Sequence, residues 1–290
     1  MNRRQAIAAL AATLSAKPGI NRLSFQGYIW YNMASRAKKP LAEMLEELFA
    51  TAPFGGYTNI ELSTTFFTPE LKDRVLKLVR HHKLNMPSVF VGGGMHTEAL
   101  AEKTITRALE VGEFCKEFGC TAIVHNPDTL PKNAAKSNEE LAIQARSLNK
   151  LGKALADKTL QLRVHHHGVE LNDKAREVRH YLANTDPKLV TFCMDVEFVY
   201  RSDMNPSAFI EEIGPRVTEL HLRNRTNNSP LQSFEDGDID YGAVAKTVAR
   251  LKLKPLIVVE LAYHDDTVIT RPFNENVRRS RLYAEKLFGL

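Results

Sequence analysis

Ala122-Ile-Val-His125 and Leu162-Arg-Val-His-His166 enclose a stretch in which Leu141, Ala145, Leu148, Leu151 and Leu155 recur at helical spacing. Each short run is rich in β-forming residues and ends on a polar side chain, whereas the intervening pattern is that of an amphipathic helix. A strand, a covering helix and a second strand in this order are typical of parallel strands in an α/β protein.

The same alternation extends in both directions from this unit. Eight β-rich runs are expected, at residues 23–28, 59–62, 88–91, 122–125, 162–166, 191–195, 217–222 and 256–261. Glu260 lies 232 positions after Tyr28, which gives about 33 residues for each of the seven repeats between them. A TIM barrel of about 250 residues has roughly 31 residues in each of its eight repeats. The sequence therefore predicts a single (β/α)8 TIM barrel. A doubly wound open sheet is the alternative, although no Gly-x-Gly-x-x-Gly or Walker motif is found.

Composition excludes several other classes of protein. The 290 residues are 43% hydrophobic and 25% charged, with a net charge of +5, which are ordinary values for a globular domain. No apolar run approaches the roughly 18–20 residues that span a bilayer, so no membrane partner is expected. Basic and acidic residues are interspersed, and nucleic acid is not an expected partner either. Cys115, Cys120 and Cys193 lack metal-ligand spacing and are predicted to be small buried hydrophobes.

The first residues form a separate segment. Arg3-Arg4 precedes a run of small apolar residues that ends at Ala16, similar to a twin-arginine export signal. We expect a leader at residues 1–16, a barrel domain at residues 17–290 and export to the periplasm. The alternative is an N-terminal helix of a cytoplasmic protein.

Four polar residues end four consecutive predicted strands: His165, Asp195, His221 and Glu260. Parallel barrel strands converge at their carboxyl ends, so these side chains should meet. Two imidazoles and two carboxylates suit one divalent ion of Mn, Co, Mg, Fe or Zn, and the absence of thiolates argues against structural zinc. Alternation places His167 on the side of His165, and His166 on the other side as a structural residue.

These segments resemble the xylose-isomerase-like barrel superfamily, which includes sugar isomerases and epimerases, inosose dehydratases and endonuclease IV. Gly56-Tyr-Thr-Asn-Ile-Glu-Leu62 is similar to the family's second strand, and Val164-His-His-His167 to its fifth. Asp195-Val-Glu-Phe198, Glu219-Leu-His-Leu-Arg-Asn224 and Gly237-Asp-Ile-Asp-Tyr241 followed by Val258-Val-Glu260 are similar to the last three units. The resemblance covers the chain from about Leu23.

The resemblance implies a pair of metal-bound Glu residues on opposite faces of the substrate, yet His165 stands at the first of these positions. A metal-bound imidazole has no free lone pair for proton transfer, so epimerisation on two faces is less firmly implied. Arg223-Asn224 replaces a Lys-Asp pair, and Phe198 removes a potential base.

The predicted function is that of a divalent-metal-dependent isomerase or epimerase acting on a ketose or keto-sugar through a metal-stabilised enediolate, without an organic cofactor. Glu260 or His167 is the expected base. Glu61, His125 or Glu170 would contact the substrate and handle a second proton, and Arg223 and Arg225 would lie where barrels bind phosphate. A keto-sugar dehydratase is the first alternative, followed by an endonuclease-IV-like hydrolase and a non-catalytic sugar-binding barrel. The expected partner is a small sugar, and homo-oligomerisation stays open.

Overall fold

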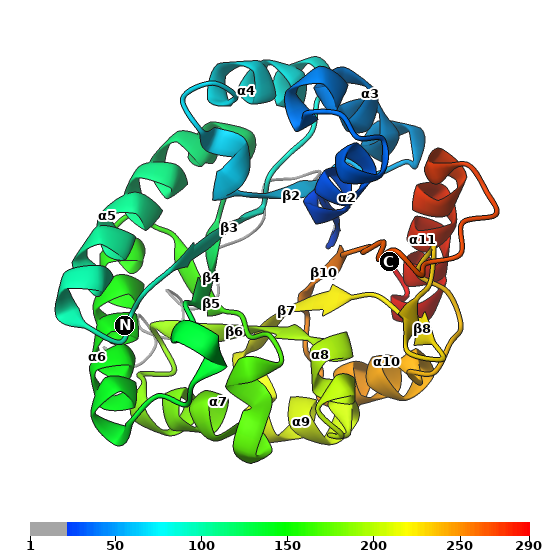
Figure 1. Cartoon of the computed structure of the whole chain (residues 1–290). Helices are drawn as coiled ribbons and strands as arrows, with labels where there is room; N and C mark the ends of the chain where they lie inside the picture. Colours follow the sequence, from blue (N-terminus) through cyan, green and yellow to red (C-terminus); the bar gives the residue numbers. More distant parts are fainter. Residues whose placement is uncertain (1–21) are drawn as a thin grey trace, which may run out of the picture.

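The computed structural model describes residues 22–290, which form one closed barrel of parallel strands surrounded by helices (Figure 1). The predicted leader at residues 1–16 lies outside the described residues. The barrel strands are β1 (Leu23–Gln26), β2 (Ile60–Ser63), β3 (Ser88–Gly93), β4 (Ala122–Pro127), β5 (Gln161–Val164), β6 (Val190–Asp195), β7 (Val217–Leu222) and β10 (Leu256–Val259). Their spatial order is β1-β10-β7-β6-β5-β4-β3-β2, so each strand neighbours the next strand along the chain and β10 closes on β1. The predicted (β/α)8 TIM barrel is confirmed.

The helices form the outer layer because each presents an apolar stripe to the strands. They are α2 (Tyr28–Arg36), α3 (Leu41–Phe54), α4 (Lys72–His81), α5 (Glu98–Cys115), α6 (Asn138–Ala156), α7 (Asn172–Asn184), α8 (Val196–Arg201), α9 (Pro206–Ile213), α10 (Tyr241–Arg250) and α11 (Phe273–Phe288). Short 3-10 turns lie at Thr64–Phe67, Lys116–Phe118, Pro131–Asn133, Val169–Leu171 and Gly214–Arg216. All three cysteines are buried, as predicted.

Some strand ends differ from the prediction. Tyr28 does not end the first strand but begins α2, since Gly27 turns the chain immediately after β1. His165 and His166 lie beyond the last residue of β5. At β3, the chain stays extended through Gly93, where an added Cβ would lie only 2.4 Å from the Thr104 hydroxyl of α5. A glycine is therefore required for the close approach of α5.

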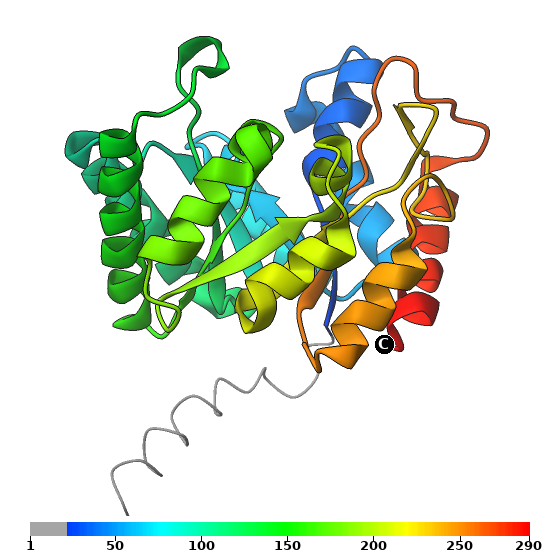
Figure 2. The ribbon, with the colours of Figure 1, turned by 90° about the horizontal axis from the view of Figure 1, so that it is seen from below.

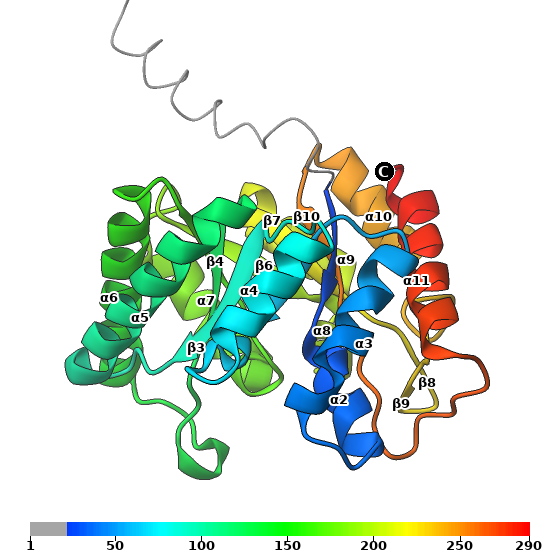
Figure 3. The same ribbon diagram turned by 90° about the horizontal axis from the view of Figure 1, so that it is seen from above.

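The loops that follow the strands project from one end of the barrel, whereas the C-terminus lies at the opposite end (Figures 2 and 3). At the loop end a small antiparallel ribbon, β8 (Arg225–Thr226) paired with β9 (Ser229–Pro230), follows β7. No helix within residues 22–290 combines the length and apolar character needed to cross a bilayer.

Candidate active site

The four predicted metal ligands meet at the loop end of the barrel. Asp195 is the last residue of β6 and pairs in register with His221 of β7, while Glu260 directly follows β10. His165 directly follows β5, on the other side of β6. One donor atom from each of the four residues falls within 4.8 Å of the other three. The tertiary structure therefore brings together the side chains that the sequence placed at four strand ends.

The donor atoms fit a divalent cation. Nε2 of His165 lies 3.9 Å from Oδ2 of Asp195, and both atoms are buried without a hydrogen-bond partner among residues 22–290. Nδ1 of His221 lies 2.9 Å from Oε2 of Glu260. Oδ2 of Asp195 has an ion-pair partner in Arg223 at 3.3 Å, whereas Nε2 of His165 has no hydrogen-bond partner among the described residues. Buried polar atoms normally have partners, so this nitrogen beside a carboxylate oxygen indicates a site for a cation.

Asp195 divides its two oxygens between two tasks. Oδ1 caps helix α8 by accepting a hydrogen bond from the Phe198 backbone N–H at 3.0 Å. Oδ2 is left facing the other donors. Burial raises the pKa of Asp195 to about 7, against the opposing charge of Arg223. A bound cation would supply the positive charge that this buried carboxylate needs to ionise.

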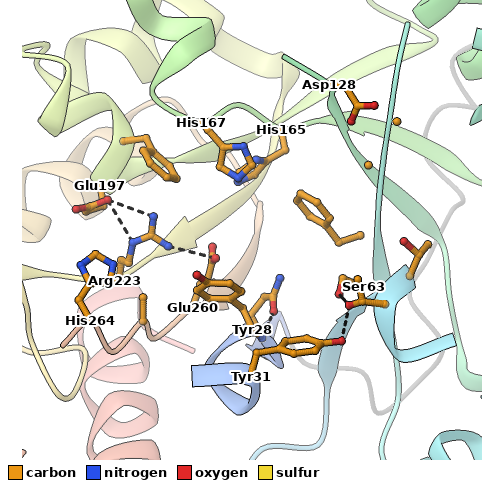
Figure 4. Close-up of a pocket in the computed structure, with 18 of the residues that line it drawn as sticks. Tyr28, Tyr31, Ser63, Asp128, His165, His167, Glu197, Arg223, Glu260 and His264 are labelled. Atoms are coloured by element: carbon orange, nitrogen blue, oxygen red, sulfur yellow. Dashed lines mark hydrogen bonds and ion pairs between the residues drawn. The ribbon is translucent and has the colours of Figure 1, made fainter. Parts of the chain in front are cut away.

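Arg223 connects the donor cluster to a further carboxylate. Its guanidinium lies 3.3 Å from Asp195, 3.2 Å from Glu197 and 3.2 Å from Glu260, as Figure 4 shows for Glu197 and Glu260. Although burial favours the protonated form, Arg223 and the bond to His221 lower the pKa of Glu260 to about 2. Glu260 is therefore held as a carboxylate, with both oxygens engaged.

A cavity of about 730 Å³ opens beside this cluster. His165, Glu260 and Arg223 line it together with His167, whose ring lies 4.9 Å from that of His165 and 5.1 Å from that of Phe198. Burial lowers the pKa of His167 to about 4, so its imidazole is neutral at pH 7 and able to accept a proton. Further lining residues include Gln26, Tyr28, Tyr31, Ser63, Phe90, Arg107, Asp128, Glu197, Arg201 and His264.

Four of the residues expected to contact a substrate do not line this cavity. Glu61 lies deeper in the barrel, where it accepts a hydrogen bond from the Ser88 hydroxyl at 2.6 Å and approaches Nε2 of His221 to 3.0 Å. His125 is fully buried, with Nδ1 placed 2.7 Å from the Val91 carbonyl oxygen. The structure does not place either side chain on the cavity, because both point into the packed interior, below the open end.

Glu170 and Arg225 also have roles other than those expected. Glu170 is buried and bonds to Asn126 and to the backbone N–H of His167. Arg225 donates to Glu197 at 2.9 Å and lines a different surface cavity, so the structure does not place it beside Glu260. Of the two predicted phosphate-binding arginines, only Arg223 reaches the main cavity, and carboxylates already surround it.

Sequence reasoning missed several cavity residues. Ser63 is the last residue of β2 and Asp128 directly follows β4, so the rule that predicted the four donor residues would also have found them. The sequence showed Glu197 only as part of a motif. Its bonds to Arg223 and Arg225, which follow the neighbouring strand β7, could not be predicted from the sequence. Tyr31 lies on α2, with its hydroxyl bonded to Thr65.

Fold and site together define a parallel (β/α)8 barrel with a buried polar centre at its carboxyl end. The chain belongs to the xylose isomerase-like TIM barrel family, because the sequence model of that family matches residues 52–286. Among curated relatives, an inosose dehydratase of Clostridium beijerinckii is 27% identical over 174 residues, covering 53% of this chain and 56% of the relative. The chain thus spans about half the length of the first curated relatives that it matches.

Solved structures give the same fold. A sugar phosphate isomerase/epimerase from Parabacteroides distasonis aligns with a TM-score of 0.70 and 16% identity, over 94% of this chain and 96% of that one. A probable 3-DHS dehydratase from Bacillus anthracis aligns with a TM-score of 0.65 and 13% identity, over 89% and 96%. Identities this low establish the shared barrel alone.

Proposed function

We propose that this chain is a divalent-metal-dependent enzyme that removes the proton beside the carbonyl group of a keto-sugar or a related polyhydroxy ketone. The observation that carries this proposal is the convergence of four nitrogen and oxygen donors within 4.8 Å, next to a cavity that His167 also lines. The curated inosose dehydratases support a sugar-like ketone as substrate.

His165, Asp195, His221 and Glu260 would hold one ion of Mn, Co, Fe, Zn or Mg. When bound, such an ion supplies positive charge that stabilises the oxygen of the ketone as the neighbouring proton leaves. Arg223 adds a fixed positive charge at the same wall of the cavity.

His167 is the base in this proposal. Its neutral imidazole lines the cavity and belongs to none of the donor groups that could hold a metal, whereas both oxygens of Glu260 are engaged and its pKa is about 2. The pKa of His167 is also low, at about 4, so the distinction rests on the engaged oxygens of Glu260 and not on basicity. Of the two candidates from the sequence, the site therefore favours His167.

Elimination of water is the favoured outcome. In that reaction the base takes the proton next to the carbonyl, and the hydroxyl group one carbon further leaves with a proton as water, which requires one protein face only. Return of the proton to the opposite face needs a second base. The family resemblance implies a Glu as this second base, at the position that His165 occupies here. Nε2 of His165 is instead turned toward the donor cluster.

Isomerisation or epimerisation is the second candidate, and Asp128 is the residue that favours it. Its side chain lines the cavity, and among residues 22–290 it forms no ion pair. A carboxyl group in this position could take up a proton as the carboxylate and then return it to carbon as the acid.

The test is to load metal-depleted protein with each candidate ion and to incubate it with open-chain and cyclic keto-sugars in deuterated water. Elimination would give an enone absorbance and a product lighter by one water, whereas isomerisation would give deuterium exchange into the recovered sugars. Glu260→Gln should abolish both. Cleavage of abasic DNA, sugar binding without exchange, or full turnover by Glu260→Gln would each overturn the proposal.

A further inference from the structure

Asn126 lies directly behind His165. It belongs to the carboxyl end of β4, the strand beside β5, and its Oδ1 atom lies 3.0 Å from Nδ1 of His165. Both side chains are buried, with 7% and 1% of their residue surface exposed, so water competes little for this contact. The geometry thus gives His165 a fixed partner on the ring nitrogen that faces away from Asp195.

The orientation of the Asn126 amide is determined by its other contacts. Its Nδ2 atom donates to the backbone carbonyl oxygen of Pro127 at 3.0 Å and to Oε1 of Glu170 at 3.2 Å. A backbone carbonyl can only accept a hydrogen bond, so the amide nitrogen must face Pro127 and the amide oxygen must face His165. Glu170 is itself held, because its Oε2 accepts from the His167 backbone N–H at 2.9 Å.

We propose that Asn126, oriented by Pro127 and Glu170, is a positioning residue that fixes His165 in the tautomer protonated on Nδ1. An amide oxygen cannot donate, so the proton of this hydrogen bond must come from the imidazole. The lone pair is then on Nε2, which faces Oδ2 of Asp195 across 3.9 Å. The ligand atom is thereby ready before any metal arrives, as is common when a polar group lies behind a metal-binding histidine.

A histidine ligand needs such a positioning partner, whereas a carboxylate ligand does not. A carboxylate ligand has equivalent oxygens, whereas an imidazole can present either nitrogen and must be held in one tautomer. His221 presents the other nitrogen: its Nδ1 lies toward Glu260, and its Nε2 lies 3.0 Å from Oε1 of Glu61. The two histidines of the cluster thus use opposite ring atoms, each with a buried polar group behind it.

The choice of Nε2 as a metal ligand rests on the proposed function, but the tautomer does not. The first measurement therefore uses the full chain without metal. Long-range proton–nitrogen NMR spectra of histidine-labelled protein at neutral pH distinguish the two neutral tautomers, and the His165 signals are assigned by their loss in His165→Gln. We expect the Nδ1–H pattern for His165. An Nε2–H pattern or an averaged one in the unmodified protein would overturn the inference, whether or not any variant folds.

Asn126→Leu tests the cause. We expect the variant to lose the Nδ1–H pattern at His165 and to bind Co²⁺ about 10–100-fold more weakly. His166 serves as the internal reference, because neither of its buried ring nitrogens has a hydrogen-bond partner among residues 22–290. The matched control is Asn276→Leu, which removes another buried, hydrogen-bonded asparagine that does not contact His165.

The outcomes separate the two ideas. A folded Asn126→Leu protein with an unchanged His165 tautomer would overturn the positioning role, as would an equal loss of Co²⁺ affinity in Asn276→Leu. If the unmodified chain shows the Nδ1–H tautomer but binds no divalent ion, the tautomer assignment stands and the proposed metal-dependent function fails.

Discussion

Nε2 of His165 and Oδ2 of Asp195 face each other across 3.9 Å, and neither has a hydrogen-bond partner within residues 22–290. Replacement of Asp195 by Asn removes a ligand charge and the carboxylate 3.3 Å from Arg223, but an asparagine side chain can still cap α8, and Glu197 and Glu260 still balance the guanidinium. We expect Asp195→Asn to bind Co²⁺ more than about 100-fold more weakly, since loss of a direct ligand should exceed the 10–100-fold effect of a supporting residue. Isothermal titration measures the affinity, and an unaltered value would exclude Asp195 from the metal site.

Glu197 should be critical for stability because it is a buried carboxylate that bonds two buried guanidinium groups, those of Arg223 and Arg225. Removing one partner of a buried ion pair leaves uncompensated charge, which costs roughly 3–5 kcal/mol. Glu197→Gln should lower the free energy of unfolding by about that amount in urea denaturation. The control is Glu212→Gln, whose pair with Arg179 is largely exposed and should contribute less than about 1 kcal/mol. Equal effects of the two variants would contradict this reading.

His167→Phe separates proton transfer from metal binding. The variant keeps the backbone N–H that bonds Glu170, and His167 is not among the clustered donors. We expect kcat for the proposed reaction to fall about 10²–10⁴-fold, the usual contribution of a general base, with Co²⁺ affinity unchanged. Normal turnover in the variant would assign the base to another residue.

The three cysteines should be chemically inert in the folded protein. Burial raises the pKa of Cys120 to about 12 and also raises the pKa of Cys115 and Cys193 well above the ordinary value of a thiol. The thiolate is the reactive form, so at pH 8.5, well below these values, iodoacetamide should modify none of them within the time that labels a free thiol. Mass spectrometry after labelling, with a sample unfolded in urea for comparison, checks this. Rapid modification without denaturant would show an accessible thiol.

Residues 1–16 lie outside the described part of the chain, and we propose from their sequence that they direct export. The twin arginines Arg3 and Arg4 are the residues that such a signal requires. Expression of the full chain in a bacterium with twin-arginine export should give protein in the periplasmic fraction. Replacing both arginines by lysine should retain it in the cytoplasm, and identical fractionation of the two proteins would disprove the signal.

The metal-ligand cluster shows how far sequence reasoning reaches. His165, Asp195, His221 and Glu260 could be predicted because parallel strands all end at the same rim, so a polar residue at the end of a strand has a defined destination. Their mutual approach within 4.8 Å follows from strand register and barrel closure, and the repeat length indicated the closure alone.

Two of the expected substrate contacts lie away from the cavity for a different reason. Glu61 and His125 also lie near strand ends, yet each points below the rim, where Ser88 and the Val91 carbonyl bind them. Depth within a barrel depends on the exact residue at which each strand ends and on its stagger against its neighbours. An error of one or two residues in a predicted strand end therefore moves a side chain from the cavity to the core.

The sequence by itself determined the barrel, the leader-like segment and the residue types at the rim, because periodicity and strand ends are local properties of the chain. Only the tertiary structure decided which nitrogen of each histidine faces the centre, which carboxylates surround Arg223 and which histidine lines the cavity outside the donor cluster. Those properties depend on contacts between residues that are far apart in sequence, such as Asn126 with His165 and Glu197 with Arg223. Hydrogen bonds of this kind are set by distances of a few tenths of an ångström, and no local pattern encodes them.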